Sequence, residues 1–188
     1  MFMKIFAILV AAWPVSEVIL GVFLRAKRGA AAVRDRGSLG LIWGAIAAAL
    51  IAGNFVRSSG VGSIGGDTTQ YLSVALVIMA AGLALRWTAI ITLGRFFTAN
   101  VAVLPGHSVV RTGVYRHLRH PSYSGMLLAF LGVGVAFDNW LSLLVIVIPI
   151  TAAVLYRIRV EETALLESLG SEYADYSKVT KRLIPGVY

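Results

Sequence analysis

Side chains able to do chemistry gather in the C-terminal half of the sequence, in two blocks separated by apolar chain. The first block, residues 112–125, contains an Arg-His-Pro sequence at 119–121. The second block, residues 157–162, begins with Arg157 and ends with two adjacent glutamates. Residues four apart share a helix face, so Arg157 and Glu161 should lie together. Guanidinium beside carboxylate suits a zwitterionic ligand, whose own carboxylate binds arginine and whose ammonium binds glutamate.

The elements that position these blocks are apolar helices. Hydrophobic residues make up 58% of the 188 positions and charged residues 14%, against about 45–50% and about 25% in soluble domains. This composition excludes a disordered chain, and the absence of cysteine excludes disulfides and thiolate chemistry. We therefore predict an all-α, polytopic membrane bundle of about five spans, or four if the last pair is re-entrant. The expected spans are 2–24, 39–56, 71–93, 123–137 and 140–156.

The last two spans should form a helical hairpin, residues 123–156, with its tight turn at Asp138-Asn139. An antiparallel pair returns both chemical blocks to the same side of the membrane. Pro121 restricts His120 to extended geometry and suits the first turn of a helix. Arg119 and His120 are therefore predicted at a helix N-terminus, where backbone donors and guanidinium form an anion-binding corner.

Basic residues occupy alternate connecting segments. Fourteen lie after the first, third and fifth spans, and only Arg57 follows the second. This pattern predicts an extracellular N-terminus and a cytoplasmic C-terminus. The net charge of +8 is thereby explained by topology and contact with membrane lipid, and no nucleic-acid partner is expected. We divide the chain into N-terminal helices (1–93) and a C-terminal module (94–188) with a cytosolic cofactor-binding part.

Several features have plainer interpretations. The Arg-Glu block could be a snorkelling anchor on a solvated helix, and Tyr173 and Tyr176 look like interfacial aromatics. No metal site is expected, because His117 and His120 alone make a weak one. Glu17, inside the first span, should face protein or water, either lining a pocket or lying near an interface. The small residues Gly40, Gly44, Ala48 and Ala52 are expected to serve internal helix packing.

Taken in order, the C-terminal motifs resemble the isoprenylcysteine carboxyl methyltransferase family. The motifs are Gly113-x-Tyr115-x3-Arg119-His120-Pro121-x-Tyr123, Glu161-Glu162 and Gly170-x2-Tyr173-x2-Tyr176. The resemblance covers about the last hundred residues and extends to phospholipid N-methyltransferases and sterol-reductase-like proteins. In this chain Thr163-Ala164 follows the glutamates where much of the family has a longer acidic cluster.

The resemblance implies S-adenosylmethionine as methyl donor and the carboxylate of a prenylated cysteine, or a similar lipid-like acid on a small molecule or protein C-terminus, as acceptor. It implies that Arg119 and Arg157 are catalytic and bind the substrate carboxylate, and we expect Gly125 to line the substrate's route. Residues implied near the cofactor are His107, Gly113, Tyr115, His120, Pro121, Tyr123, Glu161 and Glu162. Phospholipid amine methylation and an NADPH reductase-like module are the alternatives. A carboxylate is ionised at pH 7 and needs no general base, which fits the absence of an obvious one.

Overall fold

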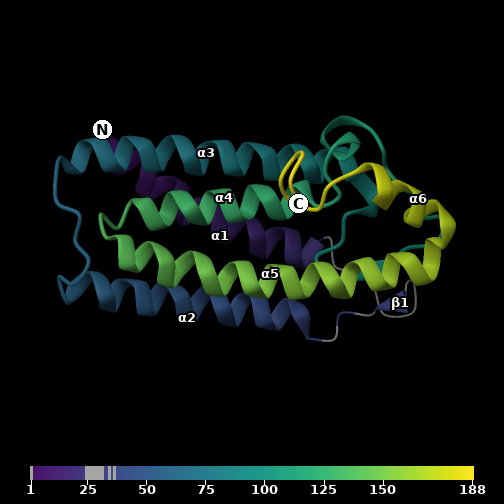
Figure 1. Ribbon diagram of the computed structural model, residues 1–188, viewed down its shortest axis with the longest axis horizontal. Coiled ribbons are helices and arrows are strands. Elements are labelled where there is room, and N and C mark those ends of the chain that lie inside the picture. Colours follow the sequence, from purple (N-terminus) through teal and green to yellow (C-terminus); the bar gives the residue numbers. More distant parts are fainter. Residues whose placement is uncertain (1, 24–31, 34, 36) are drawn as a thin grey trace.

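The protein is a helical bundle in the computed structural model, which describes residues 2–23, 32–33, 35 and 37–188. Its long helices are joined by short helical turns and two short strands (Figure 1). The elements are α1 (Phe2–Phe23), β1 (Ala32–Val33), α2 (Ser38–Ser58), α3 (Thr68–Leu93), η1 (Gly94–Phe96), β2 (Ala102–Val103), η2 (Gly113–Arg116), α4 (Pro121–Val135), α5 (Trp140–Leu169) and α6 (Ser171–Val179).

Four of these helices, α1, α2, α3 and α5, are long and apolar enough to cross a membrane. Helix α4 is apolar but has 15 residues, about 22 Å at 1.5 Å per residue, which is less than the roughly 30 Å hydrocarbon core. The helical, membrane-embedded architecture is as predicted, and a fifth span through α4 stays a prediction. Helix α5 runs on to Leu169, so the second chemical block belongs to the helix that the sequence ended at Tyr156.

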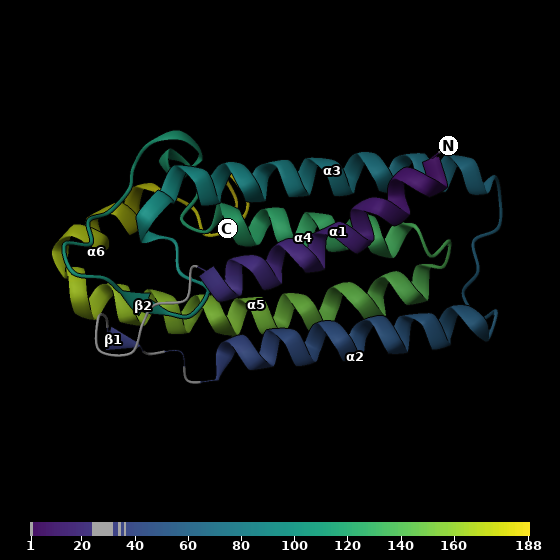
Figure 2. The same ribbon diagram turned by 180° about the vertical axis from the view of Figure 1, so that it is seen from behind.

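The helices pack as two pairs, α3 with α4 and α2 with α5, while α1 slants across the bundle (Figures 1 and 2). The core between them consists of buried apolar side chains, among them Met79, Met126, Ile146, Ile150 and Val154. Both views show α6 at one end of the bundle and the α2–α3 and α4–α5 connections at the other. The expected antiparallel arrangement of α4 and α5 is therefore present.

Small residues bring α3 and α4 into backbone contact. A Cβ atom on Gly125 would lie 2.5 Å from both the Arg86 nitrogen and the Gly82 oxygen, and one on Gly132 would lie 2.7 Å from the Met79 nitrogen. Each of these glycines is therefore needed for the close crossing. Gly125, which was expected to contact substrate, lies in this helix contact.

The prediction that the small residues at four-residue spacing in α2 serve internal helix packing is wrong. Gly44, Ala48 and Ala52 are exposed on the outer surface, and a Cβ on Gly44 would meet nothing within 4 Å. The small residues that face inward are Ala49, which is buried, and Gly53, where a Cβ would meet Ile146 at 2.8 Å. Small residues do recur every four positions on the packed face, but the set that packs against α5 is the one shifted by one position, which includes Ala49 and Gly53.

The turn between α4 and α5 is built by Asn139, which caps α5. Its side-chain oxygen accepts from Ser142 N at 2.8 Å, and its amide donates to the Val61 oxygen. At the opposite end, β1 and β2 pair antiparallel, with Ala32 opposite Val103. These two-residue strands were not predicted, and they join the α1–α2 connector to the segment after α3.

Candidate active site

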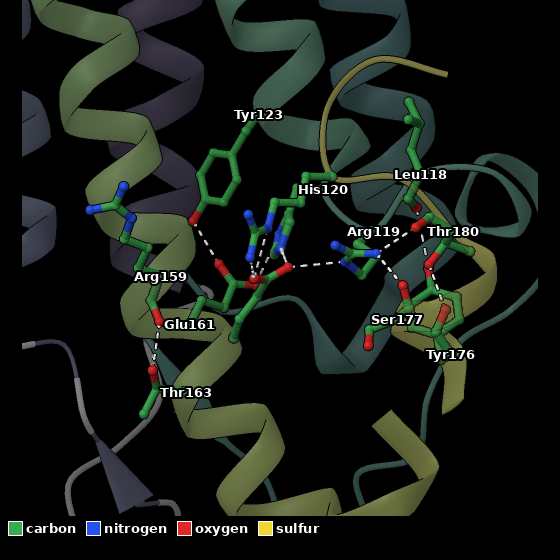
Figure 3. Close-up of polar contacts among 12 residues, drawn as sticks. Leu118, Arg119, His120, Tyr123, Arg159, Glu161, Thr163, Tyr176, Ser177 and Thr180 are labelled. Atoms are coloured by element: carbon green, nitrogen blue, oxygen red, sulfur yellow. Dashed lines mark hydrogen bonds and ion pairs between the residues drawn. The ribbon is translucent and has the colours of Figure 1, made fainter. Parts of the chain in front are cut away.

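The start of α4 and the far end of α5 meet around Glu162. Its Oε1 accepts from Arg119 Nε at 3.0 Å and lies 3.4 Å from His120 Nε2. Pro121 is the first residue of α4, as predicted. The prediction that His120 is extended is wrong: it has φ −125° and ψ 53°, and its carbonyl accepts from the amides of Tyr123 and Ser124 at the start of the helix. The structure therefore brings the two chemical blocks together, as the hairpin argument required (Figure 3).

The C-terminal segment completes this cluster. Arg182 Nε donates to Glu162 Oε2 at 2.9 Å, and the backbone of 181–182 accepts from the amides of Arg119 and His120. The Arg119 guanidinium also donates to the carbonyls of Ser177 and Thr180, toward which it points in Figure 3. Arg119 and Glu162 thus hold the C-terminal segment against the start of α4.

Glu161 belongs to a second network, which His120 joins to that of Glu162: Glu161 Oε1 lies 4.0 Å from His120 Nδ1. Its Oε2 accepts from Tyr123 Oη at 2.9 Å, and the same hydroxyl accepts from Arg157 Nε at 2.7 Å. The Glu161 side chain is 30% exposed, against 10% for Glu162. Glu161 also lines the central cavity, so it is the glutamate with a carboxylate directed toward open space.

Arg157 is buried, and most of its donors are used by protein. Besides Tyr123 it donates to Asp35 Oδ1 at 2.7 Å, to Ser38 Oγ at 2.9 Å and to the Ala99 carbonyl at 2.6 Å. Burial raises the pKa of Asp35, but the hydrogen bond and charge of Arg157 outweigh it and hold that pKa below its usual value. Arg157 therefore ties the α1–α2 connector and the segment before β2 to α5.

Two buried polar atoms beside the cavity have no hydrogen-bond partner within the described part of the chain: His107 Nδ1 and Tyr173 Oη. His107 stacks on Phe96, with ring centroids 4.6 Å apart. Burial lowers the pKa of His107, and the charges of Glu161 and Glu172 offset this only in part, so the ring is neutral at pH 7. An unpaired buried polar atom is costly unless a ligand satisfies it. Both atoms therefore point to a polar ligand at this end of the cavity.

The cavity itself has a volume of about 1090 Å³ and runs along the bundle. At the α6 end it is lined by His107, Tyr115, Tyr123 and Glu161, and toward the other end by apolar side chains such as Leu50 and Val133. A cavity of this size and polarity can hold a polar ligand and a long apolar one together. The lining comes from helices α1 to α6.

Sequence reasoning missed an arginine that lies in this cavity. Arg86 on α3 makes a paired contact with Glu17 on α1, Nε to Oε1 at 2.5 Å and Nη2 to Oε2 at 2.6 Å. Its Nη1 donates to Ser122 Oγ on α4 at 2.9 Å. An ionisable residue inside an apolar span is expensive and is usually functional. That rule singled out Glu17 in the sequence and, applied to the third span, would also have found Arg86.

The remaining predicted residues divide into two groups. Those that line the cavity are His107, Tyr115, Arg119, His120, Tyr123, Arg157 and Glu161. Gly113, Pro121, Gly125 and Glu162 do not line it. Gly113 opens η2 with a positive φ of 56°, and Pro121 begins α4, so both shape the backbone beside the site.

The prediction that Tyr173 and Tyr176 are interfacial aromatics is wrong. Both are buried and line the cavity. Tyr176 Oη donates to the Tyr115 carbonyl at 2.7 Å and attaches α6 to η2. Burial raises the pKa of Tyr176 to about 12, so it stays a neutral donor. Their i, i+3 spacing after Gly170 indicated one helix face, but not that α6 folds back over the cavity.

Comparison with known proteins identifies relatives of this arrangement. The model of the Isoprenylcysteine carboxyl methyltransferase (ICMT) family matches residues 73–167. Over 114 residues the chain is 35% identical to protein-S-isoprenylcysteine O-methyltransferase B of Arabidopsis thaliana, covering 60% of this chain and 58% of that protein. Over 117 residues it is 32% identical to protein-S-isoprenylcysteine O-methyltransferase of Schizosaccharomyces pombe, covering 61% and 50%. The chain thus spans between half and three fifths of these relatives.

A solved structure is similar as well. The eukaryotic intramembrane Ras methyltransferase ICMT superposes with a TM-score of 0.54 at 32% identity, covering 61% of this chain and 42% of that one. The family match begins within α3 and ends within α5. It includes Arg86 and both glutamates but not α1, so Glu17 lies outside it.

Proposed function

Because this chain belongs to the isoprenylcysteine carboxyl methyltransferase family, we propose that it is a membrane methyltransferase that uses S-adenosylmethionine. The proposed acceptor is the carboxylate of an isoprenylated cysteine or a similar lipid-like acid. One observation carries the proposal: a single cavity joins a polar end with two unpaired buried atoms to an apolar channel. A polar cofactor and an apolar acceptor can therefore meet in it.

The polar end fits the cofactor. S-adenosylmethionine, when bound, supplies an electrophilic methyl group on a positively charged sulfur, and transfer to a carboxylate oxygen leaves a neutral thioether and a neutral ester. His107 Nδ1 and Tyr173 Oη offer unsatisfied polar contacts, and Phe96 adds an aromatic face. Glu161 offers a carboxylate for the ammonium group, and Tyr123 holds it in place at 2.9 Å.

Arg86 is the proposed ligand of the substrate carboxylate. Arg119 donates to Glu162 and two carbonyls, and Arg157 uses its donors on four protein groups. We therefore propose that these two arginines position the cavity wall. Arg86 already holds a carboxylate in paired geometry inside the cavity, which is the geometry that a substrate carboxylate would adopt.

The chemistry requires little else from the protein. The acceptor is ionised at neutral pH, so no side chain has to remove a proton. The buried walls exclude water and hold the acceptor in line with the donor, and such positioning can lower a barrier by several kcal/mol. We further propose that the α6 end, which carries the basic connectors, is cytoplasmic and that the N-terminus is outside.

Transfer of a labelled methyl group tests this function. Purified protein in liposomes should methylate N-acetyl-S-farnesylcysteine but not phosphatidylethanolamine, and calorimetry should detect binding of S-adenosylhomocysteine but not NADPH. Arg86→Ala should lower kcat/KM by about 100-fold, the loss expected for a charge-assisted contact of about 3 kcal/mol, and leave S-adenosylhomocysteine binding intact. Arg159→Ala is the matched control, because this exposed arginine points away from Glu161 in Figure 3. Methylation of the amine lipid, or an unchanged Arg86→Ala variant, would contradict the proposal.

A further inference from the structure

Glu17 is an acidic residue in the C-terminal third of the apolar helix α1. Its side chain is 16% exposed and that of Arg86 is 8% exposed. A carboxylate at this depth is costly unless a cation neutralises it, and the same holds for the guanidinium. Each residue therefore needs a partner of opposite charge whenever it lies in the cavity.

The contact between them is the kind that arginine makes with a ligand carboxylate. Two parallel N–H groups of Arg86 meet the two oxygens of Glu17, and Trp13 Nε1 donates to Glu17 Oε1 at 2.8 Å. Glu17 and Arg86 both line the cavity. The oxygens of Glu17 thus lie where the carboxylate of an acceptor bound to Arg86 would lie.

The helix that carries Glu17 is held lightly. Of residues 3–20, only Trp13 and Leu20 are buried, and Trp13 packs on Phe130 of α4 with ring centroids 4.6 Å apart. Most of the other side chains of α1 face outward. A helix with few buried apolar contacts can shift at low cost, so the ion pair contributes much of what fixes α1 over the cavity.

We propose that Glu17 is an internal substitute for the substrate carboxylate: it occupies Arg86 between turnovers and yields it to the incoming acid. This inference rests on the proposed function. Exchange of one carboxylate for another keeps Arg86 neutralised throughout. The displaced carboxylate of Glu17 would itself be uncompensated in the cavity, so Glu17 must leave the cavity together with α1. Release of Glu17 frees α1 to move and widens the cavity for the lipid chain. The methyl ester product carries no charge, so Glu17 regains Arg86 and the ester loses its polar anchor.

Competition between Glu17 and the substrate acid for Arg86 should lower the measured affinity of the acid. The apparent affinity of the acid is reduced by the fraction of molecules in which Arg86 is free of Glu17. Removal of the Glu17 charge should therefore strengthen binding of the acid and leave the ester unaffected. A purely structural Glu17 predicts the reverse, because loss of the pair would loosen the cavity and weaken acid and ester alike.

The test compares Glu17→Gln with the wild type in liposomes. We expect the KM for N-acetyl-S-farnesylcysteine to fall by about fivefold or more, the lower end of typical coupling between sites. The inhibition constant of its methyl ester should stay within about twofold, because the ester makes no contact with the Arg86 charge. Lys4→Gln is the matched control, because it removes an exposed charge from the same helix and should change neither value.

Two further variants keep the proposal falsifiable. If Glu17→Gln does not fold, Glu17→Asp should shift the acid in the same direction by a smaller factor, because its shorter side chain weakens the paired contact. The double variant Glu17→Arg with Arg86→Glu should recover the thermal stability that each single variant loses, but it should not recover methylation. An unchanged or raised KM for the acid, or an equal shift for acid and ester, overturns the inference. If the wild type methylates no acid, the proposed function fails. The role of Glu17 can still be tested by calorimetry, which compares how tightly the wild type and Glu17→Gln bind the acid and its methyl ester.

Discussion

Substitution of Gly125 by alanine tests how the α3–α4 contact supports the site. The added Cβ would lie 2.5 Å from the Arg86 nitrogen and from the Gly82 oxygen. Both are backbone atoms, so neither can rotate away, and the helices themselves must separate. Arg86 is one of the residues displaced, and its 2.9 Å hydrogen bond to Ser122 spans this same contact.

The size of the effect follows from the overlap. Ordinary van der Waals contact begins at 3.4 Å, so the new methyl group is nearly 1 Å too close. Overpacking of this kind costs about 1–3 kcal/mol, more than the gain of about 1 kcal/mol that alanine offers over glycine in a helix. The net cost is then up to about 2 kcal/mol. At about 2–4 °C per kcal/mol for a chain of this size, Tm should fall by up to roughly 8 °C. Methyl transfer should fall as well, because Arg86 moves.

Thermal unfolding in one detergent, followed by tryptophan fluorescence, measures the shift. Gly44→Ala is the matched control, because a Cβ there meets nothing within 4 Å on the exposed face of α2; it should leave Tm unchanged or slightly raised. A Gly125→Ala protein with wild-type Tm would refute the packing argument. A normal Tm combined with weaker binding of the lipid acid alone would instead support direct contact between Gly125 and substrate.

The two adjacent glutamates should respond differently to substitution. Glu161→Gln should weaken S-adenosylhomocysteine binding by about tenfold with little change in Tm. Glu162→Gln should lower Tm, because it leaves Arg119 and Arg182 without their shared carboxylate, at a cost of up to about 3–5 kcal/mol. Calorimetry and thermal unfolding separate these outcomes, and equal effects of both variants on binding would contradict the assignment. Because burial holds the pKa of His107 below its usual 6.5, this residue contributes stability that is present above about pH 6.5 and is lost as the pH falls through the lowered value. Tm measured from pH 7.5 to 5.0 should therefore decline more steeply in the wild type than in His107→Asn, and parallel curves would exclude His107 as the group responsible.

The meeting of Arg119-His120 with Glu161-Glu162 could be predicted because it depends only on local rules. A short turn at Asp138-Asn139 forces neighbouring helices to run antiparallel, and Pro121 fixes where α4 begins. Which of the two glutamates lines the cavity could not be predicted. Successive residues differ by about 100° around a helix, and the rotation of α5 is set by its packing against α2 and α4.

Contacts between distant segments were beyond the sequence. The fold-back of α6, which buries Tyr173 and Tyr176, depends on Arg119 and on the pairing of 117–120 with 181–182. The pairing of Glu17 with Arg86 joins residues 69 positions apart. Neither the orientation of α1 nor its crossing of the bundle follows from hydropathy, which registers that a helix is apolar and not which face meets which neighbour.

The three arginines that line the cavity at the site are distinguished by where their carboxylate partners lie. Arg119 pairs with Glu162 on the neighbouring helix α5, and Arg157 pairs with Asp35, which also accepts from Ser38 at the start of α2. Both carboxylates are held by further hydrogen bonds to rigid elements, so neither arginine can release its partner without disrupting the fold. The partner of Arg86 lies on α1, which buries few of its side chains. All three arginines are paired with a carboxylate, so charge alone does not identify the one that binds substrate. What distinguishes them is how freely the paired carboxylate can move, and this favours Arg86.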